Sequence, residues 1–284
     1  MVIKLSLPKN NSKNTITSII LCAGKGTRIS DFIPSKPKPL IEINNKPILS
    51  YLISHLRKLN ISSIIIVTGH LKKQVEDYIK EIKQKYDTLK EKIFVINSGN
   101  DYKKGPLYSF LSITNEKSIL KRDLIYLVFP GDTYFEFNLI SEIITTIKNV
   151  NDLIHGNSII FYQKLQGIKL KEKEDLNKTI STINTEELES MEIVRKIEQQ
   201  KLNSISESAF YKRIIPVFVF NFKFLENIIE AEKKSSVKTI REIVNLLIKR
   251  QSILYAYSLN PDYRFYDIDT KLDLLNLNQT KRGQ

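Results

Sequence analysis

The sequence has almost no cysteine and no long apolar run, and each absence excludes a class of protein. Cys22 is the only cysteine among 284 residues, which excludes an internal disulfide and a cysteine-rich zinc site. The longest notable apolar run, 214–220, is far shorter than the roughly 18 residues that a membrane helix requires. Residues 1–6 lack the apolar core of a signal peptide. We therefore expect a cytoplasmic protein that does not associate with a membrane.

Acidic residues are fewer than basic ones, with 31 Asp and Glu against 44 Lys and Arg, for a net charge of +13. Such an excess suggests an anionic partner, and nucleic acid is the first to consider. The alternative is a composition that is rich in lysine throughout. The segment 165–213 holds equal numbers of basic and acidic residues. The rest of the chain therefore carries the whole excess, and it also carries the motifs described below.

Continuous apolar runs alternate with segments of helical spacing in the first half of the chain. The apolar runs predict buried strands over 15–21, 63–68, 92–97 and 123–129. Apolar residues three and four apart predict helices over 46–59, from 75 and over 107–113. Because such strands separated by helices are typical of a parallel sheet covered on both faces, we predict an α/β fold with a doubly wound, mostly parallel, Rossmann-like sheet.

The second half extends this pattern and encloses one segment of different character. We expect strands over 158–162, 214–220, 253–259 and 263–268, and helices from 223, over 240–249 and over 272–277. The segment 165–213 is polar, poor in glycine and low in aromatic residues. It fits a lid, an inserted subdomain or a partly disordered loop. We predict one domain over 1–284, with 165–213 as an insertion or lid within it.

A glycine turn follows the first predicted strand, where backbone N–H groups can converge on a phosphate. Gly24 and Gly26 form this turn. A Walker loop does not fit, and a dinucleotide fingerprint would need a glycine where Ile29 stands. A turn that only requires positive φ is the alternative to a phosphate site.

The turn is part of a longer pattern. LCAGKGTR at 21–28, followed by SKPKPL at 35–40, resembles the G-x-G-T-R and P-K-P-L signature of the nucleotidyltransferases that activate sugar 1-phosphates and related phosphates. Further segments resemble the same family: KPIL at 46–49, IIIVTG at 64–69, YKKGPLYS at 102–109, FPGD at 129–132, IPVFVFNFKFL at 215–225 and YDIDT at 266–270. The last resembles most the variant in cytidylyl- and molybdopterin-type transferases. The resemblance implies Mg²⁺-dependent transfer from an NTP to a small phosphorylated acceptor, with release of pyrophosphate.

The resemblance and the chemistry of this reaction assign roles to individual residues. Arg28 and Lys38 form the catalytic cationic pair that neutralises the phosphates. Asp132 and Asp267, each just past a predicted strand, would hold Mg²⁺, and Asp269 is the alternative to Asp267, with the other aspartate capping the helix that follows. The attacking phosphate is already an anion, so no general base is required. The nucleotide would contact Leu21, Ala23, Gly24, Gly26, Thr27, Asn97, Gly105 and Pro106.

The acceptor and the nucleobase stay open. Relatives that bind hexose phosphates usually have an E-K-P segment, and the nearest match, 198–200, has glutamine in the lysine position. Lys196 or Lys201 are substitutes for it. This departure leaves room for an acceptor other than a common hexose 1-phosphate: an inositol phosphate, a phosphorylated amino-alcohol and a molybdopterin are all compatible. No side chain near 97–107 decides the base.

Two further functions compete with the first. One is a molybdopterin guanylyl- or cytidylyltransferase, which shares every catalytic residue and differs in its acceptor. The other is a non-catalytic regulatory subunit of the same fold whose basic surface binds RNA or a protein. The presence of Arg28, Lys38, Asp132 and Asp267 favours an enzyme. We expect an NTP and a small phosphorylated molecule as partners rather than nucleic acid, and a homo-oligomer is compatible with this interpretation.

Overall fold

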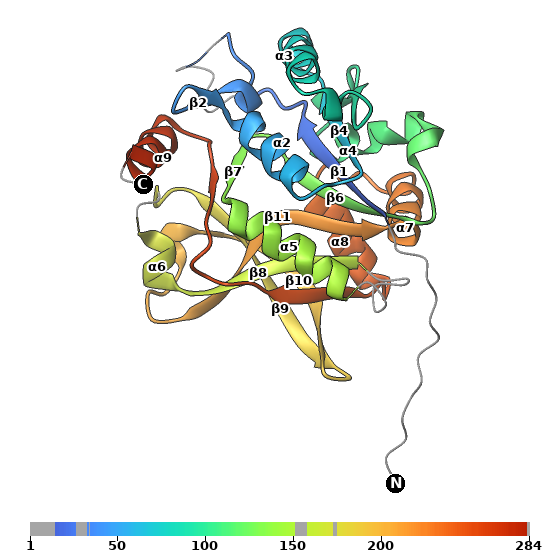
Figure 1. Ribbon diagram of the computed structural model, residues 1–284. Helices are drawn as coiled ribbons and strands as arrows, with labels where there is room; N and C mark the ends of the chain where they lie inside the picture. Colours follow the sequence, from blue (N-terminus) through green and yellow to red (C-terminus); the bar gives the residue numbers. More distant parts are fainter. Residues whose placement is uncertain (1–14, 27–32, 34, 151–157, 173–174, 283–284) are drawn as a thin grey trace.

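A nine-stranded mixed sheet with the order β5-β4-β1-β6-β11-β8-β12-β10-β9 forms the centre of the molecule (Figure 1). The structure is a computed structural model that describes residues 15–26, 33, 35–150, 158–172 and 175–282. Predicted helices and strands of both halves are present, so the α/β prediction is confirmed.

The first half of the chain forms the parallel part of the sheet. β1 pairs in parallel with β4 on one side and β6 on the other, and β4 pairs in parallel with β5. These strands end at the same edge because helices return the chain after each of them. The strands are β1 (Thr15–Cys22), β4 (Ser63–Thr68), β5 (Ile93–Asn97) and β6 (Leu124–Pro130), and the helices are α2 (Ile48–Lys58), α3 (Lys72–Lys85), α4 (Pro106–Leu111) and α5 (Phe137–Asn149).

The second half of the sheet is mixed, so the prediction of a mostly parallel sheet is wrong there. β11 (Phe210–Asn221) is antiparallel to both β6 and β8 (Ser158–Gln166), and only β12 (Leu254–Ser258) runs parallel to β8. β9 (Thr179–Leu188) and β10 (Met191–Lys201) form an antiparallel hairpin. Its two-residue loop has positive φ at both positions, which suits the twist of the strands.

The segment 165–213 is therefore built into the sheet. It contains the end of β8, α6 (Gly167–Lys171), the β9–β10 hairpin and the start of β11. β10 pairs with β12, and β9 also pairs with β11. In Figure 1 the hairpin extends beyond the rest of the sheet. That the segment acts as a lid stays a prediction.

Helices cover both faces of the sheet. Alternate residues of one strand point to opposite faces, so Ile20 belongs to a core with α2, α3 and α5, whereas Ile19 belongs to a core with α4, α7 and α8. α7 (Phe222–Glu232) and α8 (Ile240–Lys249) follow β11. A capping box of Thr239 and Glu242 fixes the start of α8.

Small elements complete the carboxyl edge of the parallel strands. β7 (Thr133–Phe135) pairs with β13 (Phe265–Asp267), and β2 (Glu42–Ile43) pairs with β3 (Lys46–Pro47). α9 (Lys271–Arg282) follows β13. Within the described ranges no helix is long and apolar enough to cross a membrane. Short 3-10 turns are η1 (Lys38–Leu40), η2 (Asp87–Leu89), η3 (Asp101–Lys103), η4 (Ser112–Asn115), η5 (Lys117–Ile119) and η6 (Leu202–Ser204).

Candidate active site

A cavity of about 630 Å³ lies at the carboxyl ends of β1 and β6. This edge of a parallel sheet is where ligands bind in α/β folds. Thr27 and Arg28, expected to bind the nucleotide and to act in catalysis, lie outside the described residues. Of the other residues that the sequence assigns to the nucleotide, to catalysis or to the metal, the cavity is lined by Leu21, Ala23, Gly24, Gly26, Lys38, Pro106 and Asp132.

The two glycines of the turn after β1 differ in what their missing side chains allow. Gly26 has a φ of +64°, and a Cβ atom there would lie 2.6 Å from Cγ of Lys38. At Gly24 a Cβ atom would meet nothing within 4 Å, and no positive φ is found. Gly26 is therefore required by a close approach of Lys38 as well as by the turn. Gly24 leaves the backbone open to the cavity.

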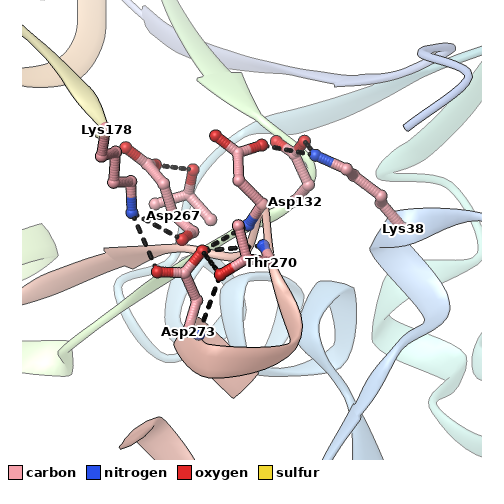
Figure 2. Close-up of polar contacts among 8 residues, drawn as sticks. Lys38, Asp132, Lys178, Asp267, Thr270 and Asp273 are labelled. Atoms are coloured by element: carbon pink, nitrogen blue, oxygen red, sulfur yellow. Dashed lines mark hydrogen bonds and ion pairs between the residues drawn. The ribbon is translucent and has the colours of Figure 1, made fainter. Parts of the chain in front are cut away.

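Lys38 ends between two carboxylates. Its Nζ lies 2.6 Å from Oδ1 of Asp269 and 3.3 Å from Oδ2 of Asp132 (Figure 2), and the residue is 8% exposed. Burial lowers the pKa of the ammonium, but the charges of Asp132 and Asp269 outweigh burial and hold the pKa above its ordinary value. Lys38 is thus a fully charged cation at the wall of the cavity.

Asp267 occupies a different environment from Asp269. β13 pairs with β7 so that Asp267 lies opposite Thr133, whose Oγ1 donates to Asp267 Oδ1 at 2.5 Å. Burial is the largest cause that raises the pKa of the Asp267 carboxyl, and the charge of Asp132 raises it further, while Lys178, Thr133 and Arg213 act in the opposite direction. The carboxylates of Asp267 and Asp132 therefore interact. The beginning of α9 is capped by Thr270 and Asp273: the Asp273 carboxylate accepts from the Thr270 N–H, and the Thr270 hydroxyl accepts from the Asp273 N–H.

The carboxylates of Asp132 and Asp267 are the groups here that could hold a metal ion. The part of the chain that the structure describes contains no group of three or more His, Cys, Asp and Glu side chains suited to hold a metal. Mg²⁺ usually takes one or two carboxylates and completes its shell with water and substrate phosphates. Asp132 borders the cavity at the ends of β1 and β6, called the large cavity below. Asp267 borders two smaller cavities, which are described below. Two interacting carboxylates between these cavities suit such an ion.

Two predicted nucleotide residues lie apart from the cavity. Asn97 lines a neighbouring hollow, and its Oδ1 accepts a hydrogen bond from the Gly99 N–H at 2.9 Å. Gly105 has a φ of +135°, and a Cβ atom there would lie 2.5 Å from the carbonyl oxygen of Lys238. The same carbonyl accepts from the Leu107 N–H at 3.0 Å. Gly105 therefore joins α4 to the segment before α8.

The cavity is also lined by residues that sequence reasoning did not assign to the site. Phe218 and Pro216 of β11 line it, together with Ser109 of α4. They lie in the segments 215–225 and 102–109, which resemble the family, but the resemblance gives these three side chains no role of their own. Asp273 was also not assigned a role, although its spacing from Thr270 is that of a capping box.

Two smaller cavities continue from the large one toward the segment 165–213. The first, of about 160 Å³, shares Pro216 and Phe218 with the large cavity and is lined by Lys178, Arg213 and Arg241 among others. The second, of about 240 Å³, shares Lys178, Arg213 and Asp267 with the first. The guanidinium carbon of Arg213 lies 4.6 Å from the centre of the Phe265 ring. The first of these cavities, with three cationic side chains beside Asp267, thus adjoins the large cavity.

Comparison with known proteins supplies a family. Residues 18–162 match the family model described as "MobA-like NTP transferase domain". The chain is 30% identical over 145 residues to D-glycero-alpha-D-manno-heptose 1-phosphate guanylyltransferase of Campylobacter jejuni, which covers 48% of this chain and 58% of that protein. It therefore spans less than two thirds of the length of this relative.

Two other comparisons extend over nearly the whole chain. A Methanocaldococcus jannaschii protein assigned as a UTP–glucose-1-phosphate uridylyltransferase is 25% identical over 278 residues, covering 92% of this chain and 91% of the relative. The crystal structure of UDP-glucose pyrophosphorylase complexed with UDP-glucose superposes with a TM-score of 0.69 at 16% identity, covering 95% of this chain and 99% of that chain. The likeness to the solved structure is one of fold.

Proposed function

The chain belongs to the family of MobA-like NTP transferase domains, and from this premise we propose that it is an Mg²⁺-dependent nucleotidyltransferase. It would join the nucleotidyl group of an NTP to a sugar 1-phosphate or a similar small phosphorylated acceptor and release pyrophosphate. One observation carries the proposal: Lys38, Asp132 and Asp269 meet at the wall of a cavity at the carboxyl edge of the parallel strands. We also infer that the parallel part, with helices on both faces, is the doubly wound arrangement of Rossmann-like folds.

The large cavity would bind the NTP. Backbone N–H groups of the turn at Gly24 and Gly26 would donate to the phosphates, and at Gly24 open space lies where a side chain would stand. Lys38, already held at the cavity wall by two carboxylates, would neutralise negative charge on the phosphates. Arg28 is proposed as its cationic partner from the sequence signature.

The carboxylates of Asp132 and Asp267 are the proposed ligands of Mg²⁺. The support is that their charges interact and that they lie on either side of the boundary between the large cavity and the smaller ones. Bound there, Mg²⁺ would supply the positive charge that stabilises the phosphates during transfer. Asp269 would not bind the metal; it would hold Lys38 through their ion pair.

The acceptor would enter from the smaller cavities. Arg213 and Arg241 would bind its phosphate in place of the lysine that the E-K-P segment of hexose-phosphate relatives supplies. The acceptor phosphate would then approach the NTP where the cavities share Pro216 and Phe218. Since this phosphate is an anion at neutral pH, it attacks the α-phosphorus without a general base, and pyrophosphate leaves.

We also propose that the protein is cytoplasmic. Its single cysteine, Cys22, is buried and free, which is in keeping with a reducing compartment.

A pyrophosphate-release screen tests this function. The purified protein with Mg²⁺ is given CTP, UTP, GTP, dTTP or ATP against hexose 1-phosphates, inositol phosphate, phosphocholine and molybdopterin. We expect release with one pair of substrates, which identifies base and acceptor together and separates a sugar-phosphate enzyme from a molybdopterin enzyme. No release and no NTP binding by calorimetry would contradict the proposal and favour a regulatory subunit.

Three matched variants test the assignment of the aspartates. Asp132→Asn and Asp267→Asn should each reduce Mg²⁺-dependent turnover by at least roughly 100-fold, because each removes charge from a metal ligand. Asp269→Asn should slow turnover but leave the dependence on Mg²⁺ concentration unchanged, since Asp269 holds Lys38. If instead Asp269→Asn changed the dependence on Mg²⁺ and Asp267→Asn did not, Asp269 would be the metal ligand and Asp267 would not.

A further inference from the structure

We infer that Lys178, which belongs to the segment 165–213, is a positioning residue. It fixes the loop 267–270 and, with the loop, the carboxylates of Asp267 and Asp269. The inference rests on the proposed function, in which these carboxylates hold Mg²⁺ and Lys38. Lys178 lies far from the loop in the sequence and belongs to no recognised motif. Its contacts give it this role.

Lys178 holds the beginning of the loop directly. Its Nζ donates to the main-chain carbonyl oxygen of Asp267 at 3.1 Å and forms an ion pair with Asp273 Oδ1 at 3.2 Å (Figure 2). The side chains of Lys178 and Asp273 are each 9% exposed. A charged pair this well shielded from water is weakened little by solvent and salt. The carbonyl contact therefore fixes the backbone from which the Asp267 carboxylate projects.

Lys178 holds the end of the loop through Asp273. Oδ2 of Asp273 accepts from the N–H of Asp269 at 2.9 Å and from the N–H of Thr270 at 2.8 Å, and also from the Thr270 hydroxyl at 3.0 Å. The Asp273 carboxylate is thus shared between the loop and Lys178. Because the Asp269 backbone is fixed in this way, its side chain reaches Lys38.

The main chain of Lys178 is itself anchored within the segment 165–213, directly before β9. Its carbonyl oxygen accepts from the Leu202 N–H at 2.9 Å, and its own N–H donates to the carbonyl oxygen of Asp175 at 2.8 Å. β9 begins at the next residue. The side chain thus connects the hairpin of the segment 165–213 to the loop that carries the proposed metal ligand.

Lys178→Met tests the inference because it removes the ammonium but keeps the length of the side chain. Asp273 keeps its three donors from Asp269 and Thr270, so the variant does not leave an unpartnered buried carboxylate. NTP binding is measured by calorimetry in the absence of acceptor, once with Mg²⁺ and once with EDTA, using the NTP that wild type prefers. We expect the gain in affinity from Mg²⁺ to fall roughly 10–100-fold, as for other residues that orient metal ligands, and the affinity in EDTA to stay unchanged.

Lys171→Met is the matched control. Lys171 belongs to the same segment and pairs with Glu207 at 3.4 Å, but it does not contact the loop. It should bind Mg²⁺ and NTP as wild type does. Asp273→Asn is a second variant that breaks the same connection, and because it also removes the charge that holds the N–H groups of Asp269 and Thr270, it should lower the Mg²⁺-dependent affinity at least as much as Lys178→Met. Thermal denaturation of all variants verifies that each is folded.

The outcomes separate the possible roles of Lys178. It also lines both acceptor-side cavities, so an unchanged Mg²⁺-dependent affinity with a raised KM for the acceptor would overturn the inference and make Lys178 a substrate contact. Wild-type behaviour in every assay would overturn it as well. If wild type itself shows no Mg²⁺-dependent NTP binding, the proposed function fails first, and the inference fails with it.

Discussion

At the scale of single residues, Lys38 explains how carboxylates can be brought together beside an apolar cavity. Carboxylates held close to each other repel, and burial adds to the cost of their charge. The ammonium of Lys38 lies between Asp132 and Asp269 and offsets this repulsion. In the proposed function the same cation would also neutralise the phosphates of the substrate. Electrostatic preorganisation of this kind requires that the Lys38 side chain be held in one conformation.

Gly26 leaves the space that the Lys38 side chain occupies in this conformation, so Gly26→Ala should destabilise the protein. Positive φ costs an L-residue roughly 1–2 kcal/mol, and the new Cβ atom would lie 2.6 Å from Cγ of Lys38. Lys38 cannot move away freely because its far end is held by two carboxylates. We expect the free energy of unfolding in urea, measured without nucleotide, to fall by about 1–2 kcal/mol or more.

Gly24→Ala is the control for this prediction, since a Cβ atom at Gly24 meets nothing within 4 Å in the same turn. Its free energy of unfolding should stay within about 0.5 kcal/mol of wild type. Equal stability of the two variants would show that the approach of Lys38 to Gly26 is not a constraint.

The residues of the site were predictable where one sequence motif contains them. The turn after β1 and the aspartate after β6 line the cavity because each directly follows a parallel strand. Asn97 and Gly105 follow the same logic in the sequence but make other contacts, with Gly99 and with Lys238. The contact of Gly105 joins segments distant in the chain, and one sequence without an alignment does not reveal it.

At the scale of secondary-structure elements, α8 shows how a local signal fixes a boundary. The carboxylate of Glu242 accepts from the N–H groups of Lys238 and Thr239 at 2.8 and 3.0 Å, and the Thr239 hydroxyl accepts from the Glu242 N–H at 3.1 Å. Ile240, in the first turn, lines the large cavity. The predicted bounds of this helix, 240–249, are those of the structure.

Glu242→Gln should therefore lower stability in a pH-dependent way. The hydrogen bond from the Lys238 N–H is the largest cause of a lowered pKa for the Glu242 carboxyl; burial opposes it, and Thr239 adds to it. A lowered pKa gives stability that is present above the ordinary glutamate pKa of about 4.3 and is lost as the pH falls through the lowered value. We expect wild type to exceed the variant by about 0.3–1 kcal/mol at neutral pH, and the gap to close as the pH falls below the lowered pKa. A gap that does not change with pH in thermal denaturation would contradict this.

Elements were predictable where their apolar pattern is strong and were misjudged where it is weak. β4 is a continuous apolar run and has the predicted bounds. β9 and β10 bury only some of their residues, so their sequences contain no such run. The segment 165–213 therefore gave no strand signal, and the antiparallel second half of the sheet was not foreseen.

At the scale of the whole molecule, the net charge of +13 is in keeping with an anionic small-molecule substrate. Three lysines, Lys25, Lys38 and Lys103, line the large cavity, and Arg213 and Arg241 line the adjoining one. Positive potential in clefts raises the local concentration of a triphosphate and its rate of association. A nucleic-acid partner is not needed to account for the charge.

The arrangement of the two cores predicts that the chain unfolds as one unit. Ile19 and Ile20 are neighbours in β1 but belong to different cores, and the same alternation continues through Ile64 and Ile65 in β4. Neither core can lose its packing without disrupting strands that support the other. We expect one calorimetric transition whose van't Hoff and calorimetric enthalpies agree.

Two matched truncations test this cooperativity. Leu52 in α2 packs in one core and Leu247 in α8 packs in the other, and each is 3% exposed. Leu52→Ala and Leu247→Ala should each cost about 2–5 kcal/mol and shift the single transition, followed by both calorimetry and far-UV circular dichroism, to lower temperature without splitting it. Two transitions in either variant would show that the cores on the two faces of the sheet unfold independently, as separate domains do. Since the proposed active site draws on residues from both halves, Lys38 and Asp269 among them, such a division would also predict loss of nucleotide binding at the first step.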